Sequence, residues 1–216
     1  MIILYSGTPG SGKSLHCART IYYALKRGEP VIANFAIDEK QVGKHKGSFI
    51  YKSNEELTPD YLVSYSLEYC SGRRVKEGGL LLVIDEAQLM FNSRDYSRKD
   101  RSDWLTFFSQ HRHLNYDIIL IAQFDRMLDR QIRSLIEYET IHRKVSNFGW
   151  KGKLLSLAAF GNLFVSVKVW YPMRLRTDSE FFRASKKYYS LYDTHALFER
   201  TNDRLRGDGG PAEGSG

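Results

Sequence analysis

Apolar residues occur along the first two-thirds of the chain in short blocks separated by longer amphipathic or polar segments. Continuous apolar runs of this kind are typical of parallel strands that are buried on both faces. The strands that they predict are residues 2–6, 31–33, 80–84 and 118–122, with a further short strand at 49–51. The segments between them predict helices at residues 13–27, 59–70, 102–111 and 128–136, of which the first ends at Gly28 and the second starts with Pro59.

The pattern changes after residue 136, where two segments of alternating character predict additional strands at 139–145 and 164–171. A Gly-rich stretch joins these segments, and Pro172 ends the second. The expected fold class is therefore α/β, with a mostly parallel sheet flanked by helices and extra C-terminal strands. We expect one domain at residues 1–195 and a flexible tail at 196–216, and a mobile loop at 93–101.

Composition narrows the possible partners. The chain has 216 residues and a formal net charge of +7, which favours acidic partners such as nucleic acid, anionic lipid or nucleotides, although it also serves solubility. Its two cysteines have no metal-ligand spacing and are expected to be reduced. The longest apolar runs fall far short of the ~20 residues of a membrane helix, so the chain as given is not expected to span a bilayer.

The strongest chemical signal is a phosphate-binding loop between the first strand and the first helix. The segment Gly7-Thr8-Pro9-Gly10-Ser11-Gly12-Lys13-Ser14 matches the pattern G-x-x-x-x-G-K-[ST] in full. Its glycines allow backbone N–H groups to turn around a phosphate, and the helix that follows directs its positive dipole end at the anion. Together with Leu15, this segment is expected to bind ATP, with Lys13 on the β- and γ-phosphates and Ser14 as a magnesium ligand.

A second signal is the acidic pair that ends the apolar run at 80–84. The carboxyl ends of parallel strands face the nucleotide in folds of this class, so Asp85 is expected to hold the magnesium hydration shell. Glu86 is the candidate general base that orients and deprotonates the attacking water. A carboxylate directed at water favours hydrolysis over transfer of phosphate to a substrate hydroxyl. The alternative role for either acid is to cap the helix that starts at Ala87.

Polar residues at other strand ends are weaker candidates. Gln123 follows the strand beside the acidic pair and is expected to sense the γ-phosphate or the water, and Asn34 also ends a strand. One arginine is expected to reach a neighbouring subunit's γ-phosphate and stabilise the charge of the transition state. We take Arg112 as this residue, and Arg126, Arg130 and Arg133 remain alternatives.

Two clusters have simpler explanations. His111 and His113 lack a third ligand nearby, so hydrogen-bonded histidines are expected there rather than a metal site. Tyr188, Tyr189 and Tyr192 follow two lysines, and they either stack on nucleic-acid bases or belong to the core, which we favour.

In its motifs and their order, the chain resembles the N-terminal ATPase domain of the zonular occludens toxin (Zot) family, which is related to the gene I assembly protein of filamentous phages. The segments that carry the resemblance are the phosphate-binding loop, the run LLLVIDEAQ from Leu80 to Gln88, His111-Arg112-His113, the strand ending at Gln123, the segment Leu128–Arg133 and the stretch KYYSLY from Lys187 to Tyr192.

The resemblance implies more than the motifs do. Family members are inner-membrane ATPases that power the assembly and extrusion of filamentous phage, and they look related to hexameric DNA-pumping ATPases. It implies a homo-oligomer, such as a hexamer, with phage assembly proteins and single-stranded DNA as partners. It also implies a place at the cytoplasmic face of the host inner membrane, through a helix that this chain does not contain. The toxin activity belongs to a distal region of the family and is not expected here.

The function expected from these observations is magnesium-dependent ATP hydrolysis that powers the export of DNA or virions. The alternatives are a kinase that phosphorylates a small metabolite or nucleotide, and an ATPase that remodels or packages nucleic acid.

Overall fold

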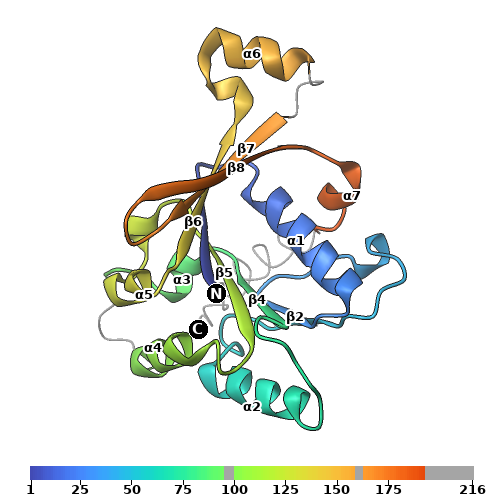
Figure 1. The fold of residues 1–216 in the computed structure, drawn as a ribbon, viewed down its shortest axis with the longest axis vertical. Coiled ribbons are helices and arrows are strands. Elements are labelled where there is room, and N and C mark those ends of the chain that lie inside the picture. The colour runs from blue at the N-terminus through green and yellow to red at the C-terminus, as the bar shows by residue number, and fades with distance from the viewer. Residues whose placement is uncertain (95–99, 159–162, 193–216) are drawn as a thin grey trace, which may run out of the picture.

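The computed structural model describes residues 1–94, 100–158 and 163–192, which form a central sheet flanked by helices (Figure 1). Across the described residues the sheet has eight strands in the order β3-β2-β4-β5-β1-β6-β7-β8. Their bounds are β1 Ile2–Ser6, β2 Val31–Ala33, β3 Phe49–Tyr51, β4 Leu80–Ile84, β5 Tyr116–Ile121, β6 Tyr138–Lys144, β7 Leu163–Trp170 and β8 Leu175–Arg183. The strands from β3 to β6 in this order pair in parallel, and β7 and β8 are antiparallel, which confirms the predicted fold class.

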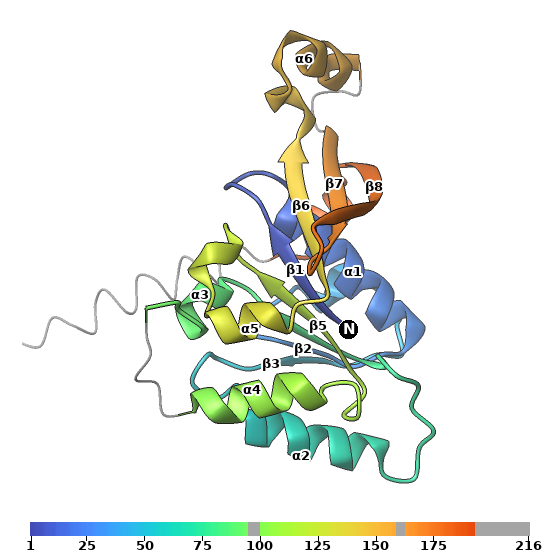
Figure 2. The ribbon, with the colours of Figure 1, turned by 60° about the vertical axis from the view of Figure 1, so that its left-hand side comes forward.

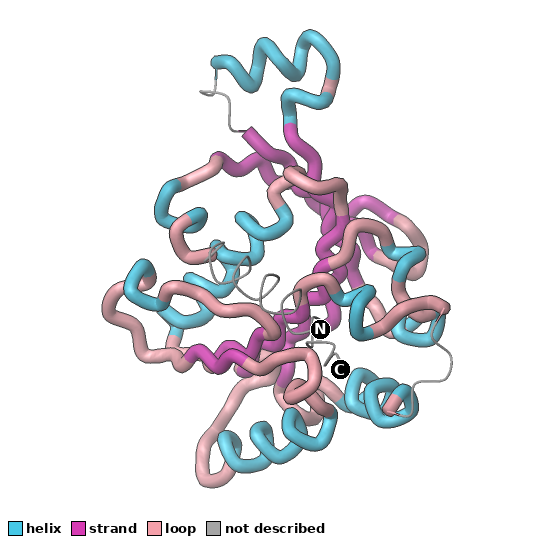
Figure 3. Tube along the Cα trace, turned by 180° about the vertical axis from the view of Figure 1, so that it is seen from behind, coloured by secondary structure: helices cyan, strands magenta, loops and turns pink. Residues whose placement is uncertain are grey.

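Helices connect most of the parallel strands, as Figure 3 shows from behind. The α-helices in the described residues are α1 Lys13–Arg27, α2 Pro59–Cys70, α3 Ala87–Met90, α4 Arg101–Gln110, α5 Arg130–Ser134, α6 Gly149–Ala158 and α7 Lys186–Tyr189. Three short 3-10 helices lie at η1 Glu39–Gln41, η2 Asp125–Met127 and η3 Val145–Asn147. The predicted bounds of α1 and α2 are the observed ones, because Gly28 closes α1 in a left-handed conformation and Thr58 caps α2.

The parallel sheet separates two cores, which explains why its central strand β4 is apolar at every position. On β4, Leu80, Leu82 and Ile84 face the cluster under α2 and α4, and Leu81 and Val83 face the cluster under α1. Figure 2 shows these helices on opposite sides of the sheet. With both faces covered, the carboxyl ends of the strands become the accessible edge at which a ligand can bind.

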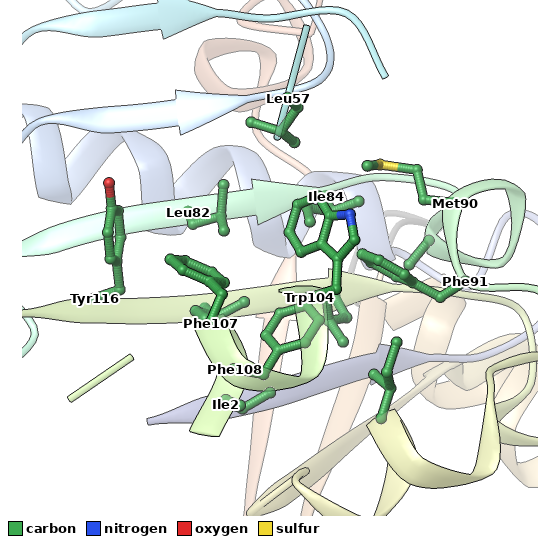
Figure 4. Packing of buried hydrophobic residues seen from close by; sticks show 14 of the residues in the cluster. Ile2, Leu57, Leu82, Ile84, Met90, Phe91, Trp104, Phe107, Phe108 and Tyr116 are labelled. Atoms are coloured by element: carbon green, nitrogen blue, oxygen red, sulfur yellow. The ribbon is translucent and has the colours of Figure 1, made fainter. Parts of the chain in front are cut away.

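Aromatic residues fill the core between the sheet and α4 (Figure 4). The rings of Phe91 and Trp104 meet edge to face with their centroids 5.0 Å apart, and Phe107 meets Tyr116 in the same way at 5.4 Å. The indole Nε1 of Trp104 donates to Asp100 Oδ2 at 3.0 Å, so its polar atom is satisfied. This packing fixes α4 and the segment after β4, which carries the acidic pair.

Two elements of the C-terminal part differ from the prediction. The stretch read as a Gly-rich connector contains α6, which projects with the ends of β6 and β7 away from the rest of the molecule (Figures 1 and 2). Gly152 does not end this helix. It allows the helix to pack closely on the backbone before it, because a Cβ at this position would lie 2.3 Å from the carbonyl oxygen of Val145. Strand β8 was not predicted either, because most of its side chains are exposed and its sequence shows no apolar alternation.

The remaining differences are smaller. The helix expected at 128–136 is reduced to α5, whose start is capped by the Asp129 side chain. Much of the predicted loop at 93–101 and all of the predicted tail at 196–216 lie outside the described residues. In the part of the chain that the structure describes, we find no helix with the length and apolarity needed to cross a membrane.

Candidate nucleotide-binding site

The glycine-rich segment forms a loop between β1 and α1, at the carboxyl ends of the central strands. Its first amide, Gly7 N–H, donates to the carbonyl oxygen of Gln123 at 3.1 Å, which ties the loop to the end of β5. Gly7, Gly10 and Gly12 have φ angles of 140°, 72° and 98°, which other residues rarely adopt. Gly12 caps α1 without a side-chain hydrogen bond, so the first amides of the helix are available to an anion.

The side chains of the loop also fit a polyphosphate. The hydroxyl oxygen of Ser11 is buried without a hydrogen-bond partner among the described residues. The Lys13 ammonium donates to the carbonyl oxygens of Gly7 at 2.7 Å and Thr8 at 3.3 Å, within the loop itself. Burial lowers the pKa of Lys13, and the negative charges of Asp85 and Glu86 oppose this shift. The structure therefore brings the lysine and both predicted acids into one electrostatic site.

Asp85 is held in place at the end of β4. Its backbone N–H donates to Asn34 Oδ1 at 2.7 Å, and its carbonyl oxygen accepts from Asn34 Nδ2 at 2.9 Å. Asn34 thus positions the acidic pair from the end of β2. The Asp85 Oδ1 atom accepts from the Glu86 N–H at 2.9 Å, and Oδ2 accepts from the Tyr192 hydroxyl at 2.5 Å. Burial raises the pKa of this carboxyl.

Glu86 occupies a strained position, which is frequent at functional sites. Its φ of 46° and ψ of 46° lie in the left-handed region, although glutamate has a Cβ. The side chain is exposed, and the Gln88 amide donates a hydrogen bond to its carboxylate. Gln88 itself is buried, so it orients the Glu86 carboxylate from α3. The role of Gln88 has no signal in the sequence, because nothing in the residue type indicates which neighbour it contacts.

The donor set fits magnesium, which prefers oxygen ligands and keeps several waters. Ser14 supplies a hydroxyl and Asp85 a carboxylate, and both interact with the same tyrosine hydroxyl, that of Tyr192. Among the described residues no group of three or more His, Cys, Asp and Glu side chains could enclose a metal ion. A cation here would therefore be held by these two residues together with waters and phosphate oxygens.

Gln123 lies where the sequence placed it, and Arg112 does not share its location. Gln123 lines a cleft of about 430 Å³ together with Gly7 and Thr8. Arg112 lies before β5, at the opposite edge of the sheet, where it forms ion pairs with Glu137 and Glu77. Arg112 and the loop are therefore not brought together within one chain.

Arg126 and the three C-terminal tyrosines also differ in where they lie relative to the loop. Arg126 lies in η2, just after Gln123, and is exposed at the carboxyl edge. Tyr188 and Tyr192 pack against the core under α1, as favoured from the sequence, and Tyr189 is exposed.

A histidine pair beneath the loop, formed by the half-buried His16 and the buried His142, was not anticipated. His16 Nδ1 and His142 Nε2 are 2.8 Å apart, and His142 Nδ1 lies 3.2 Å from the carbonyl oxygen of Ser6. Arg19, which is paired with Glu180, reaches His16 Nε2 at 3.3 Å. Burial lowers the pKa of His16 to about 4 and that of His142 to about 3, so both rings are neutral at pH 7. The two histidines are 126 residues apart, so only the fold reveals the pair.

Comparison with known proteins agrees with this geometry. The family model described as "Zonular occludens toxin (Zot)" matches residues 1–195. The chain belongs to the Zot family. Among curated relatives, the Gene 1 protein of Enterobacteria phage I2-2 is 28% identical over 216 residues, which cover 94% of this chain and 58% of that protein. The Zot-family chain thus spans less than two-thirds of that relative's length.

Solved structures extend the likeness to nucleotide-binding proteins. The N-terminal domain of zonular occludens toxin from Neisseria meningitidis superposes with a TM-score of 0.55 at 20% identity, covering 89% of this chain and 98% of that one. The genome packaging NTPase B204 from Sulfolobus turreted icosahedral virus 2, in complex with ATP-γS, has a TM-score of 0.50 at 16% identity. The match covers 84% of this chain and 96% of that one. At these identities the similarity establishes a shared P-loop NTPase fold.

Proposed function

We propose that this Zot-family domain hydrolyses ATP with magnesium and that the hydrolysis powers the assembly and extrusion of filamentous phage. One observation carries the proposal: Lys13, Asp85 and Glu86 share one electrostatic site at a loop where Gly12 caps α1 without a side-chain hydrogen bond and the buried Ser11 hydroxyl has no hydrogen-bond partner among the described residues. The family resemblance supports the process, and the ATP-γS complex of the B204 neighbour supports the nucleotide.

Each residue has a distinct role in the proposed reaction. The amides of the loop and the Lys13 ammonium bind the β- and γ-phosphates, with Leu15 behind them in the first turn of α1. Ser14 and Asp85 hold magnesium, which neutralises charge on the phosphates when it is bound. Glu86 accepts the proton of the attacking water, and the hydrogen bond from Gln88 keeps the carboxylate in position. Gln123 contacts the water or the γ-phosphate from the end of β5.

The arginine of the mechanism comes from a second copy of the chain. Arg112 lies at the edge of the sheet opposite the loop, so it can reach a γ-phosphate only across a subunit interface. This is the geometry that a ring of subunits, such as a hexamer, provides. Arg126 is the alternative because it already lies at the carboxyl edge. We propose that the ring stands at the cytoplasmic face of the inner membrane with phage assembly proteins and single-stranded DNA as its partners.

Release of inorganic phosphate tests the proposal directly. The purified protein is incubated with ATP and magnesium in the absence of any phosphate acceptor, with and without single-stranded DNA. We expect magnesium-dependent release, and stimulation by DNA would favour a nucleic-acid-translocating motor. Binding of ATP without release, or transfer of phosphate only to a small acceptor, would overturn hydrolysis in favour of a kinase.

A further inference from the structure

The last described segment of the chain, residues 185–192, contacts α1 and ends at the candidate magnesium site. We call this segment the C-terminal strap. Leu191 is fully buried in the core under α1, and its carbonyl oxygen accepts from the Asp38 N–H at 3.0 Å. Tyr192 forms an antiparallel bridge with Ile37, and its ring stacks on Phe35 with centroids 4.7 Å apart. The strap is thus held by the backbone and by apolar contacts.

The hydroxyl of Tyr192 reaches both residues assigned to magnesium. It donates to Asp85 Oδ2 at 2.5 Å, and it lies close to the side chain of Ser14. The other carboxylate oxygen of Asp85 accepts from the Glu86 N–H, so neither oxygen of Asp85 is free of a protein donor. A tyrosine hydroxyl therefore occupies the position between the two groups that a hydrated cation would need.

We propose that Tyr192 is a positioning residue that competes with magnesium and that its hydroxyl leaves Asp85 when the cation binds. This inference rests on the proposed function, because it concerns the same cation site. A magnesium-bound water that donates to Asp85 Oδ2 has to share this oxygen with the Tyr192 O–H, and the charge of the cation makes the carboxylate a weaker acceptor for that hydroxyl. Binding of the metal and the hydrogen bond from Tyr192 therefore oppose one another. When the cation binds, the end of the C-terminal strap is held by its backbone and apolar contacts alone, and it opens more often.

The apolar contacts of the ring allow a clean test. Tyr192→Phe removes the hydroxyl and keeps the stacking on Phe35 and the burial of Leu191, so the strap stays in place. Tyr189→Phe is the matched control, since this tyrosine belongs to the same strap and its side chain is 53% exposed. Neither substitution changes the net charge at neutral pH.

The first measurement is the magnesium concentration at half-maximal binding of a fluorescent, non-hydrolysable ATP analogue. A hydrogen bond to a charged group is strong enough that its loss shifts an equilibrium by about tenfold. We therefore expect Tyr192→Phe to require about tenfold less magnesium than the wild type, and Tyr189→Phe to match the wild type. An unchanged or higher requirement in Tyr192→Phe would overturn the competition. If the wild type binds no analogue at any magnesium concentration, the proposed function fails as well.

The second measurement uses the wild type alone and follows amide hydrogen exchange. The Asp38 N–H, which donates to Leu191 O, reports whether the strap is docked. We expect it to exchange faster with the analogue and magnesium than with the analogue and EDTA. Equal or slower exchange with magnesium, alongside normal analogue binding, would sink the inference about Tyr192 and leave the nucleotide site intact.

Discussion

The two ends of the parallel strands differ in how their polar groups are partnered. At the carboxyl ends, the loop contains three glycines with positive φ, Glu86 is in a left-handed conformation and the Ser11 hydroxyl is buried without a partner among the described residues. At the amino ends, charges meet opposite charges: the Met1 ammonium lies 2.9 Å from Asp117 Oδ1, and Arg112 pairs with Glu137. The amino edge also has a left-handed residue, Asn115 with a φ of 59°, and a buried nitrogen, His111 Nε2, that forms no hydrogen bond with a described residue. Its charged side chains are paired, whereas the strained and unpaired groups of the carboxyl edge are concentrated around one loop.

This contrast indicates which edge of the sheet binds a ligand and which edge contributes only to stability. Strained backbone and unsatisfied buried groups cost folding free energy, and they persist where a ligand uses them. Ion pairs at a solvent-exposed edge contribute little but satisfy their charges. Substitutions at the carboxyl edge should therefore change nucleotide chemistry with little change in stability, and those at the amino edge should lower stability slightly and leave nucleotide binding unchanged.

Lys13→Ala should have the largest effect, because it removes the positive charge that we propose binds the phosphates. We expect nucleotide binding and hydrolysis to fall by roughly 10²-fold or more. Fluorescence titration with an ATP analogue and a phosphate-release assay measure the two quantities. Lys26→Ala, at the far end of the same helix, is the control and should retain both. Wild-type binding by Lys13→Ala would contradict the assignment of the loop.

Glu86→Gln should separate binding from chemistry. The amide keeps the size of the side chain and cannot accept the proton of the water, so hydrolysis should drop by about 10²–10⁴-fold while ATP still binds. Single-turnover phosphate release together with the binding titration checks this expectation. The matched control is Glu77→Gln at the amino edge, which should hydrolyse ATP at the wild-type rate. A fully active Glu86→Gln variant would show that another residue is the general base.

The histidine pair beneath the loop predicts a stability that depends on pH. Both pKa values are depressed in the folded state, to about 4 for His16 and about 3 for His142, from the usual 6.5. Between pH 6.5 and 4 the unfolded chain binds more protons, so the free energy of unfolding should decrease as the pH falls, by about 1 kcal/mol per pH unit for each histidine. Urea denaturation at pH 7, 6, 5 and 4.5 measures this slope.

Substitution of one member of the pair identifies the source of the slope. His16→Gln can still hydrogen-bond to His142 and Arg19 but does not titrate, so the slope should become shallower. His113→Gln, an exposed position before β5, should leave it unchanged. Equal slopes in the wild type and His16→Gln would show that other groups cause the acid sensitivity.

Arg112→Ala should have the smallest effect on the isolated chain. Its ion pairs are half-exposed, so we expect a loss of about 0.5 kcal/mol in unfolding free energy and unchanged nucleotide binding. If copies of the chain assemble and Arg112 acts across the interface, hydrolysis should fall only at concentrations that support assembly. Light scattering and phosphate release over a concentration series test this. Loss of nucleotide binding in a dilute solution of the Arg112→Ala variant would contradict the location of Arg112 at the amino edge.

The sequence predicted those helices and strands whose bounds depend on residues next to them in the chain. The bounds of α1, α2, β2 and β4 followed from a closing glycine, a cap and continuous apolar runs. The placement of the acidic pair at the carboxyl ends followed from strand direction alone. In contrast, α6 was hidden by glycines that permit close packing instead of ending a helix, and β8 by its exposed side chains.

The partners of the site residues needed the tertiary structure. The contact of Tyr192 with Asp85 joins positions 107 residues apart, and the hydrogen bond of Gln88 depends on the left-handed turn at Glu86. Neither has a periodic or spacing signal. Arg112 is a different case, because it precedes a parallel strand, so strand direction alone places it at the amino edge and away from the loop.

Gly12 shows how closely the antiparallel part of the sheet is joined to the phosphate loop. A Cβ at this glycine would lie 2.8 Å from the ring of Phe164 on β7. The ring also stacks on Phe182 of β8, so the hairpin forms a wall behind the start of α1. A chimera that receives its β7–β8 hairpin from another family member must therefore match the donor residue at position 164 to the recipient's loop, or it will distort the nucleotide cradle.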